Sequence, residues 1–504
     1  MTSFKAEGQE AFKSHLWRTI DLGHHSIRWL DVIYQSKPNA QNEDENIEST
    51  VVDQGKALTL DRLALCELES LHTKLLPSQS YLDRKLAFPE WKSIDSLASS
   101  PHLGAPTAFE KQDGKLWINT PDGEYVPSTL FSRWMSEVLT PPKVIGEETT
   151  KKNQSLVWLN SSSQLPSVAA LTYRCLSELP YTHGASLNRS IATLIGVGQT
   201  RKDHVKKGIW GVLDIGISQG SWSLIEVNDS HVPQHLTYKM LKTYGRSFIG
   251  ERGLRRTLLN HHLQKSQMSW SELEAKQRLE WLDYISLQAD TLLRRSWPKL
   301  LDTSGMVSES HVQVDETLYE LFQRYHHGTY QGVLSWINHS LQSSNIGPEA
   351  LRGIYVTGKH ALGVSVPLRR ILSAVNVRVA PFEIELEGAQ RYVETMLYRE
   401  GLGYYIEEVT PFALIFRDDE EGLTKEIFSE QSEVPCMHEI DIGPTKGKVS
   451  LWLSSYGDVE QKLAEHPAVS EKLTLQIYYE GPHLFELNWR TASGKKPDNH
   501  WSTV

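Results

Sequence analysis

Two short segments place an aspartate and a glycine in a tight turn between two apolar, strand-like runs. The first contains Asp21 and Gly23, and the second contains Asp214 and Gly216 in the same relative positions. Such a hairpin can present backbone N–H groups to phosphate, because glycine allows close approach and the aspartate can face a magnesium-bound water. One Asp-x-Gly alone is ordinary turn chemistry. Two copies in the same layout favour a pair of phosphate-binding hairpins.

A third segment joins a strand-like run at 354–357 to Gly358 and then to a helix that we expect to begin near Pro367. A glycine turn between a strand and a helix N-terminus can hold a ribose or a phosphate. Three pairs of adjacent histidines predict no metal site, since neighbouring side chains point in different directions and no carboxylate accompanies them at ligand spacing.

The composition limits the classes of partner. The chain has 504 residues, with 62 acidic and 52 basic side chains and a net charge of −10. Because the basic residues are scattered, we expect protein or small-molecule partners and no nucleic acid or membrane. No apolar stretch of ~20 residues and no leader-like start is present, which predicts a cytoplasmic protein. Cys66, Cys175 and Cys436 lie far apart, so reduced thiols are expected rather than disulfides or a zinc site.

Elements that could position these residues follow from the apolar pattern. Strand-like runs alternate with helical patterns over the first four-fifths of the chain, with the clearest helix at 271–296, so an α/β body is predicted. The polar segments 37–55 and 142–155 are predicted to be exposed loops. Closely spaced strand-like runs then predict a small β domain, in which only 458–466 could be a helix. The expected strands of the body are 116–119, 156–159, 209–215 and 354–357.

Taken in order, these segments resemble the ATPase domain of the DnaK-type seventy-kilodalton heat-shock chaperones. Residues 21–23 (DLG) resemble the family's first phosphate hairpin, and residues 213–227 resemble the second. Residues 186–198 are similar to its NEPTAAALAYG segment, Gly358 falls in its adenosine motif, and 318–341 match a long helix. The resemblance implies an α/β, actin-like (ribonuclease H-like), two-lobed ATPase-type body.

The resemblance continues into the C-terminal part. Residues 409–412 (VTPF) are similar to the VTPLSL that opens the family's substrate-binding β-sandwich. The implied organisation lacks the family's helical lid. It consists of an N-terminal extension (1–15), the nucleotide-binding-type domain (16–398), a linker (399–408), the β-sandwich (409–496) and a tail (497–504).

Site residues carry over position by position from the family. The residues that the resemblance places around a nucleotide are Asp21, Gly23, His24, His25, Asp214, Gly216, Ser218, Gly358 and Lys359. Leu414, Phe416 and Val449 correspond to the peptide groove, and Tyr404, Tyr405 and Ile406 to the apolar linker.

Several positions depart from the family's ATPase chemistry. Gln219 replaces a threonine, Ser221 an aspartate and Arg189 a glutamate, which leaves no convincing catalytic residue. The branched Ile217 stands where backbone should approach phosphate, and Lys74 is a weak candidate for the lysine near the attacking water. Losing carboxylates disfavours Mg²⁺ and predicts crippled hydrolysis, whereas binding of ATP or ADP stays open.

Three functions remain in competition. The first is a pseudo-ATPase of this chaperone family that binds unfolded or specific protein clients, or docks on an authentic chaperone. The second is an active chaperone driven by slow ATP hydrolysis. The third, an actin-like structural protein, gives the β domain no role and is disfavoured.

Overall fold

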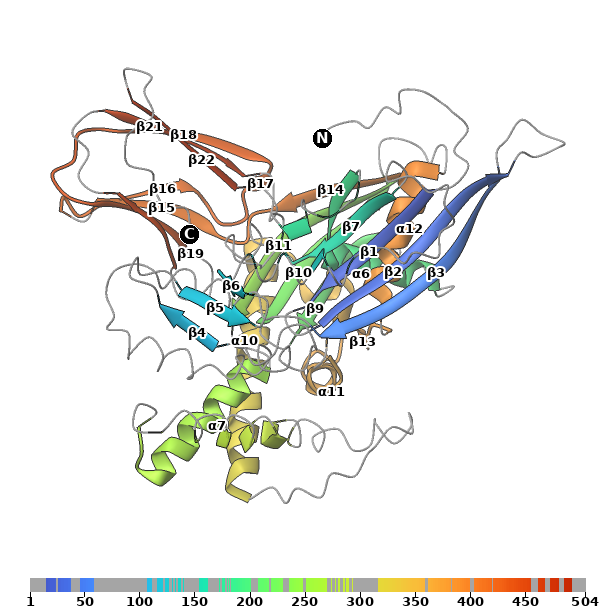
Figure 1. Ribbon diagram of the computed structural model, residues 1–504. Coiled ribbons are helices and arrows are strands. Elements are labelled where there is room, and N and C mark those ends of the chain that lie inside the picture. Colours follow the sequence, from blue (N-terminus) through green and yellow to red (C-terminus); the bar gives the residue numbers. More distant parts are fainter. Residues whose placement is uncertain are drawn as a thin grey trace.

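The computed structural model describes most of the body and the C-terminal part. The described ranges are 15–23, 26–37, 46–58, 107–110, 116–120, 123–126, 154–161, 183–200, 207–216, 219–229, 235–247, 251–269, 316–358, 361–381, 383–398, 403–418, 420–454, 461–466, 472–479 and 485–491, with single positions within 129–139, 172–181 and 273–292. The structure is a mixed α/β protein with two large mixed sheets and small antiparallel sheets near the C-terminus (Figure 1).

The first large sheet has the strand order β3-β2-β1-β7-β8. Strand β1 pairs antiparallel with β2 and parallel with β7, and β8 continues the parallel half. The strands are β1 (His15–Leu22), β2 (Ser26–Lys37), β3 (Asn46–Leu58), β7 (Gln154–Asn160) and β8 (His183–Asn188).

The second large sheet repeats this arrangement as β13-β12-β9-β10-β11. Its first three strands in chain order are again antiparallel, and the last two run parallel to the first. The strands are β9 (Gly208–Ile215), β10 (Gln219–Asp229), β11 (His235–Ser247), β12 (Leu351–Thr357) and β13 (Val377–Val379). In both sheets the fifth strand leads into a helix, α6 (Arg189–Thr200) after β8 and α12 (Ile384–Tyr398) after β13.

Helices α6 and α12 pack against each other and join the two sheets through one core. This core combines residues of β2, β7, β9, β10, α6 and α12. Two glycines allow the close approach: a Cβ on Gly196 would lie 2.2 Å from the carbonyl oxygen of Ile384, and one on Gly388 would lie 1.9 Å from that of Ala192. Backbone therefore faces backbone where the two helices cross.

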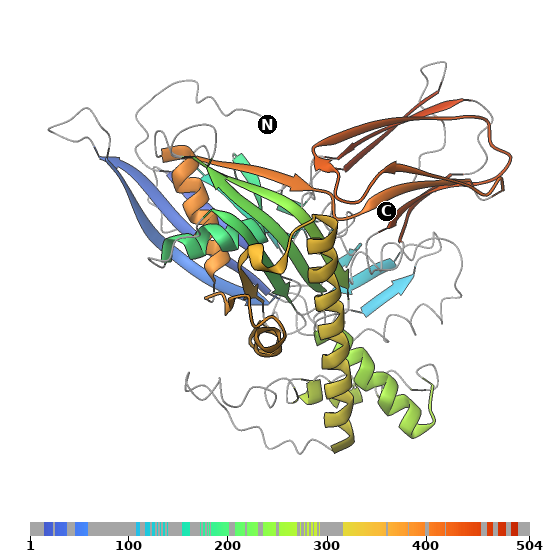
Figure 2. The ribbon, with the colours of Figure 1, turned by 180° about the vertical axis from the view of Figure 1, so that it is seen from behind.

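The remaining helices cover the second sheet and extend from it. Helix α10 (Glu316–Ser343) buries its C-terminal half against β10 and β12, and its N-terminal half packs with α7 (Glu251–Ser266). Figure 2 shows α10 extending beyond the sheet toward α7. Helix α11 (Ala361–Ile371) follows β12. A 3₁₀ turn (Pro348–Ala350) precedes β12. No described helix is both long and apolar enough to cross a membrane.

The C-terminal part packs two antiparallel sheets over a common core that includes Phe412, Leu451 and Leu475. One sheet has the order β16-β15-β19-β20 and the other β18-β21-β22, and a third small sheet, β4-β5-β6, lies elsewhere in the chain. The bounds are β15 (Ala413–Asp418), β16 (Leu423–Phe428), β18 (Cys436–Ile442), β19 (Val449–Ser454), β20 (Gln461–His466), β21 (Leu473–Tyr479), β22 (Phe485–Thr491), β4 (Thr107–Glu110), β5 (Leu116–Thr120) and β6 (Gly123–Tyr125).

The segment predicted as a linker is largely a strand. Strand β14 (Gly403–Val409) adds to the second sheet parallel to β11, and the short β17 (Glu433–Val434) pairs with its end. Figure 1 shows β14 running from α12 to the C-terminal sheets. Of the predicted extension only His15 is described, and the predicted tail at 497–504 lies outside the described residues.

Three local predictions were wrong. Residues 46–55 of the expected loop belong to β3, whose polar composition fits an edge strand that pairs only with β2. Residues 461–466 form strand β20 instead of a helix, because they pair with β19. Helix α11 begins at Ala361, so Pro367 lies inside it rather than near its start. In each case tertiary pairing or packing overrides the local signal.

Replacing Gly388 with alanine should lower the free energy of unfolding by about 1–3 kcal/mol, because the new methyl group would meet the Ala192 backbone and force the helices apart. Denaturant unfolding measures the change. Gly328→Ala is the matched control: nothing lies within 4 Å of its Cβ position in α10, so it should raise stability by up to about 1 kcal/mol through helix propensity alone. Equal losses in both variants would contradict close α6–α12 packing.

Candidate functional site

The two predicted hairpins occupy equivalent places in the two large sheets. Asp21 is the seventh residue of β1 and Asp214 the seventh of β9, and each faces the second strand of its hairpin. Asp21 is in register with Arg28, and Asp214 with Ser221. Gly23 and Gly216 follow two residues after the buried aspartates, just past the strand ends, as the repeated Asp-x-Gly pattern predicted.

A single guanidinium joins the two hairpins. Arg189, the first residue of α6, donates from Nη2 to Asp21 Oδ1 and from Nη1 to Asp214 Oδ2 at 3.1 Å. Its side chain is 17% exposed, whereas those of Asp21 and Asp214 are 3% and 10% exposed. The arginine therefore lies between the two carboxylates that sequence reasoning assigned to phosphate and metal.

Arg28 extends the cluster to helix α12. Its Nε donates to Asp21 Oδ2 at 2.9 Å, and its Nη2 lies 3.7 Å from Glu385 Oε2. Glu385 is 3% exposed and accepts a hydrogen bond at Oε1 from Thr357 Oγ1. We call these six residues the interlobe cluster: Asp21, Arg28, Arg189, Asp214, Thr357 and Glu385. It connects β1, β2, α6, β9, β12 and α12.

Burial and the neighbouring opposite charges shift the pKa values of Arg189 and Glu385 in opposite directions. Burial alone would lower the pKa of Arg189, but the charges of Asp21 and Asp214 outweigh it and raise that pKa, so the guanidinium stays charged. Burial raises the pKa of Glu385 above its ordinary value even though Arg28 lies beside it. The cluster is thus a desolvated network in which the arginines stay charged, whereas burial opposes the ionisation of Glu385.

Gly358 closes the cluster next to the second hairpin. Its φ of +91° lies in the region that favours glycine, and a Cβ there would lie 2.6 Å from Asp214 Oδ1 and 2.5 Å from the Ile215 carbonyl oxygen. The third predicted element therefore does meet the second one. The contact is backbone packed directly on the Asp214 carboxylate.

This arrangement does not fit Mg²⁺. Both oxygens of Asp21 bond to arginines, and one oxygen of Asp214 bonds to Arg189, so a hard cation would have to displace buried guanidinium groups. Among the described side chains, no group of three or more His, Cys, Asp or Glu is placed to hold a metal ion. Phosphate oxygens would likewise have to compete with two carboxylates for Arg189.

Of the other predicted nucleotide and catalytic positions, two are described by the structure and the rest lie outside the described residues. Gln219 begins β10, and Ser221 lies on β10 beside Asp214, only 4% exposed. Neither is a carboxylate, and Ser221 has no acidic oxygen to offer a metal. His24, His25, Lys74, Ile217, Ser218 and Lys359 lie outside the described residues.

The predicted peptide-groove residues belong to the β-sandwich core. Leu414 and Val449 are 0% exposed and Phe416 is 5% exposed, and all three pack in one apolar cluster. Alternation along β15 and β19 turns these side chains inward, so they do not line an open groove in this conformation. The apolar side chains that the sandwich does expose include Leu423 and Met437, at 53% and 65%.

The predicted linker residues hold β14 on the body. Tyr404 packs on Tyr238 and Tyr392, with ring centroids 5.8 and 6.1 Å apart, and Ile406 joins the same core, whereas Tyr405 is 37% exposed. At the end of the strand, Glu408 accepts a hydrogen bond of 3.2 Å from Asn188 Nδ2.

Sequence reasoning missed Arg28, Glu385, Thr357 and Glu408. Arg28 could have been found, because a tight hairpin around Gly23 places it opposite Asp21. Glu385 and Glu408 carry no local signal, since each reaches its partner only through the packing of α12 and β14. Arg189 was identified as the replacement of a family glutamate, but its pairing with the two aspartates was missed.

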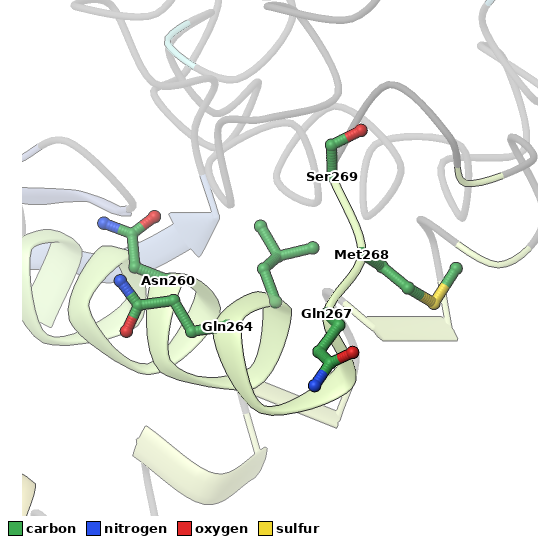
Figure 3. A pocket seen from close by; sticks show the side chains of 6 residues that line it. Asn260, Gln264, Gln267, Met268 and Ser269 are labelled. Carbon is green, nitrogen blue, oxygen red and sulfur yellow. The ribbon is translucent and has the colours of Figure 1, made fainter.

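One surface pocket lies away from these groups and shares no residue with them. It lies at the end of α7 and is lined by Asn260, Leu263, Gln264, Gln267, Met268 and Ser269, whose side chains are all neutral (Figure 3). Ser269 provides a hydroxyl group there, but none of the six lining residues is an acid or a base that could activate it.

No protein-family model matches this chain, and no curated protein is significantly similar to it. Functional inference therefore depends on the interlobe cluster and on the sheet topology themselves.

Substituting Arg189 by methionine keeps most of the side-chain volume but leaves Asp214 without its ion pair and the two hairpins without their shared cation. We expect a loss of about 3 kcal/mol in the free energy of unfolding, measured with denaturant. Arg324→Met in α10 is the control, because that arginine is 78% exposed and 3.9 Å from Glu320, and should cost less than about 0.5 kcal/mol. A loss as small as the control's would show that the cluster contributes little.

The titration of Glu385 should appear in the pH dependence of stability. Because its pKa is raised in the folded chain, the native state holds the proton more tightly, and stability is lost as pH rises through the raised pKa. The neutral Glu385→Gln variant escapes this loss. We therefore expect the melting temperature of the variant, relative to that of the wild type, to increase as pH rises from about 4 to neutral. A decrease in this difference would contradict burial as the dominant cause of the raised Glu385 pKa.

Proposed function

We propose that this chain is a protein-binding relative of the DnaK-type chaperones whose ATPase-like body works without nucleotide. The observation that carries the proposal is Arg189, whose guanidinium contacts Asp21 and Asp214 at once. An internal cation there supplies, between the two carboxylates, the positive charge that magnesium would otherwise supply. The body would be an actin-like, two-lobed scaffold.

Topology supports the scaffold part of the proposal. The two sheets share a five-strand order. Each has an aspartate one residue before the end of its first strand and a helix after its fifth, which supports a duplicated nucleotide-binding body. In this proposal the C-terminal sheets correspond to the family's substrate-binding sandwich. Their position after β14 supports a function in binding proteins, either clients or a partner chaperone.

The expected biochemical behaviour is protein binding that ignores ATP. The purified chain should slow the aggregation of a thermally unfolding enzyme, or form a complex with an authentic chaperone, to the same extent with and without ATP and Mg²⁺. Calorimetric titration of ATP should give no binding heat, and thermal unfolding should lack the ~2–3 kcal/mol stabilisation that a hundredfold excess over a dissociation constant produces.

Two results would overturn the proposal. Phosphate release at the turnover of an active family member would favour the slow ATP-driven foldase instead. Failure both to protect unfolding proteins and to bind a chaperone would remove protein binding as the function.

A further inference from the structure

A contact along the edge of β11 joins the C-terminal sheets to the body. Residues 403–407 of β14 pair with 235–239 of β11, and Lys239 Nζ lies 3.1 Å from Glu407 Oε2. Farther along β11, the side chain of Gln431 continues the contact: Thr243 N–H donates to its Oε1 at 2.8 Å, and its Nε2 donates to the Thr243 carbonyl at 2.9 Å.

This carboxamide acts as a one-residue extension of the sheet. Gln431 lies in the turn between β16 and β17 at a φ of +69°, and its own N–H donates to the Thr410 carbonyl at 2.9 Å. Thr410 N–H in turn donates to the Ser432 carbonyl at 2.8 Å. The turn thereby holds the chain just after β14, so β14 and this turn attach to β11 together. We call the two the dock, defined as residues 403–410 and 429–434.

Two consecutive residues link the dock to the interlobe cluster: Asn188 contacts the dock, and Arg189 belongs to the cluster. Asn188 Nδ2 donates to Glu408 at 3.2 Å, while Asn188 Oδ1 accepts from Ser190 N–H at 2.9 Å and so caps helix α6. The next residue, Arg189, holds Asp21 and Asp214. The first turn of α6 is thus fixed on one side by the dock and on the other by the two hairpins.

We propose that the first turn of α6 couples the two contacts, so that the interlobe cluster keeps the C-terminal sheets docked without any bound ligand. A shift of this turn that releases Arg189 from the aspartates also displaces Asn188 from Glu408. By thermodynamic reciprocity, loosening the dock weakens the cluster by the same free energy. The inference concerns contacts within the chain and does not depend on what the sandwich binds.

Hydrogen exchange of the full-length chain, without nucleotide or client, tests the coupling. Asn188→Asp retains the cap, because aspartate is an equally good N-cap, but it removes the donor to Glu408 and places a carboxylate beside it. We expect amides of 403–410 to exchange about tenfold faster in this variant, and amides of 21–28 to exchange faster as well. The tenfold change in exchange rate corresponds to ~1.4 kcal/mol. Glu408→Gln is the matched control, because it keeps an acceptor for Asn188, and its exchange rates should stay within about twofold of those of the wild type.

Arg189→Met tests the coupling in the reverse direction, from the cluster to the dock. It should raise the amide exchange rates of 403–410, although the substituted residue lies outside the dock. Faster exchange in 21–28 with unchanged exchange in 403–410 would overturn the coupling. If the core of α10 also loses protection, the variant has unfolded, and Arg189→Lys is used in its place. The lysine ammonium keeps the positive charge but cannot span both aspartates. Faster exchange in both 21–28 and 403–410 again supports the coupling, and faster exchange in 21–28 alone overturns it.

Discussion

The rest of the structure depends on the contact of Arg189 with two aspartates that lie far apart in the sequence. Each carboxylate lies one residue before the end of the first strand of its own sheet; Arg28 also bonds to Asp21, but Arg189 is the residue that reaches both carboxylates. Without the arginine, two buried negative charges would face each other across the junction of the sheets. An isolated buried charge is costly, whereas a paired and hydrogen-bonded one is tolerated. The pairing therefore determines how the two halves meet.

Helix packing brings this arginine to its place. Gly196 and Gly388 let α6 and α12 approach backbone to backbone, which fixes where the first turn of each helix lies. The first turn of α6 then delivers Arg189 to the aspartates, and the first turn of α12 delivers Glu385 to Arg28 and Thr357. Apolar packing sets the geometry, and the charges make that geometry specific.

Local patterns in the sequence predicted many of the strands but not the contacts between elements that lie far apart in the chain. The repeated Asp-x-Gly turns predicted both hairpins, and the apolar runs at 156–159, 209–215 and 354–357 are strands β7, β9 and β12. Polar β3 and strand β20 were missed, because an edge strand is defined by its partner rather than by its own composition. The ion pair of Arg189 could not be foreseen, since it depends on a helix crossing that no short window of sequence records.

The two helices that follow the fifth strands also carry opposite charges in their first turns, Arg189 in α6 and Glu385 in α12. Otherwise the halves repeat one topology, and a repeated half could in principle associate with a copy of itself. Here such an association would place arginine against arginine, or glutamate against glutamate, in a desolvated junction. The charge asymmetry thus makes each half recognise only the other. It disfavours contact between two copies of the same half, much as complementary charges set partner choice in paired helices.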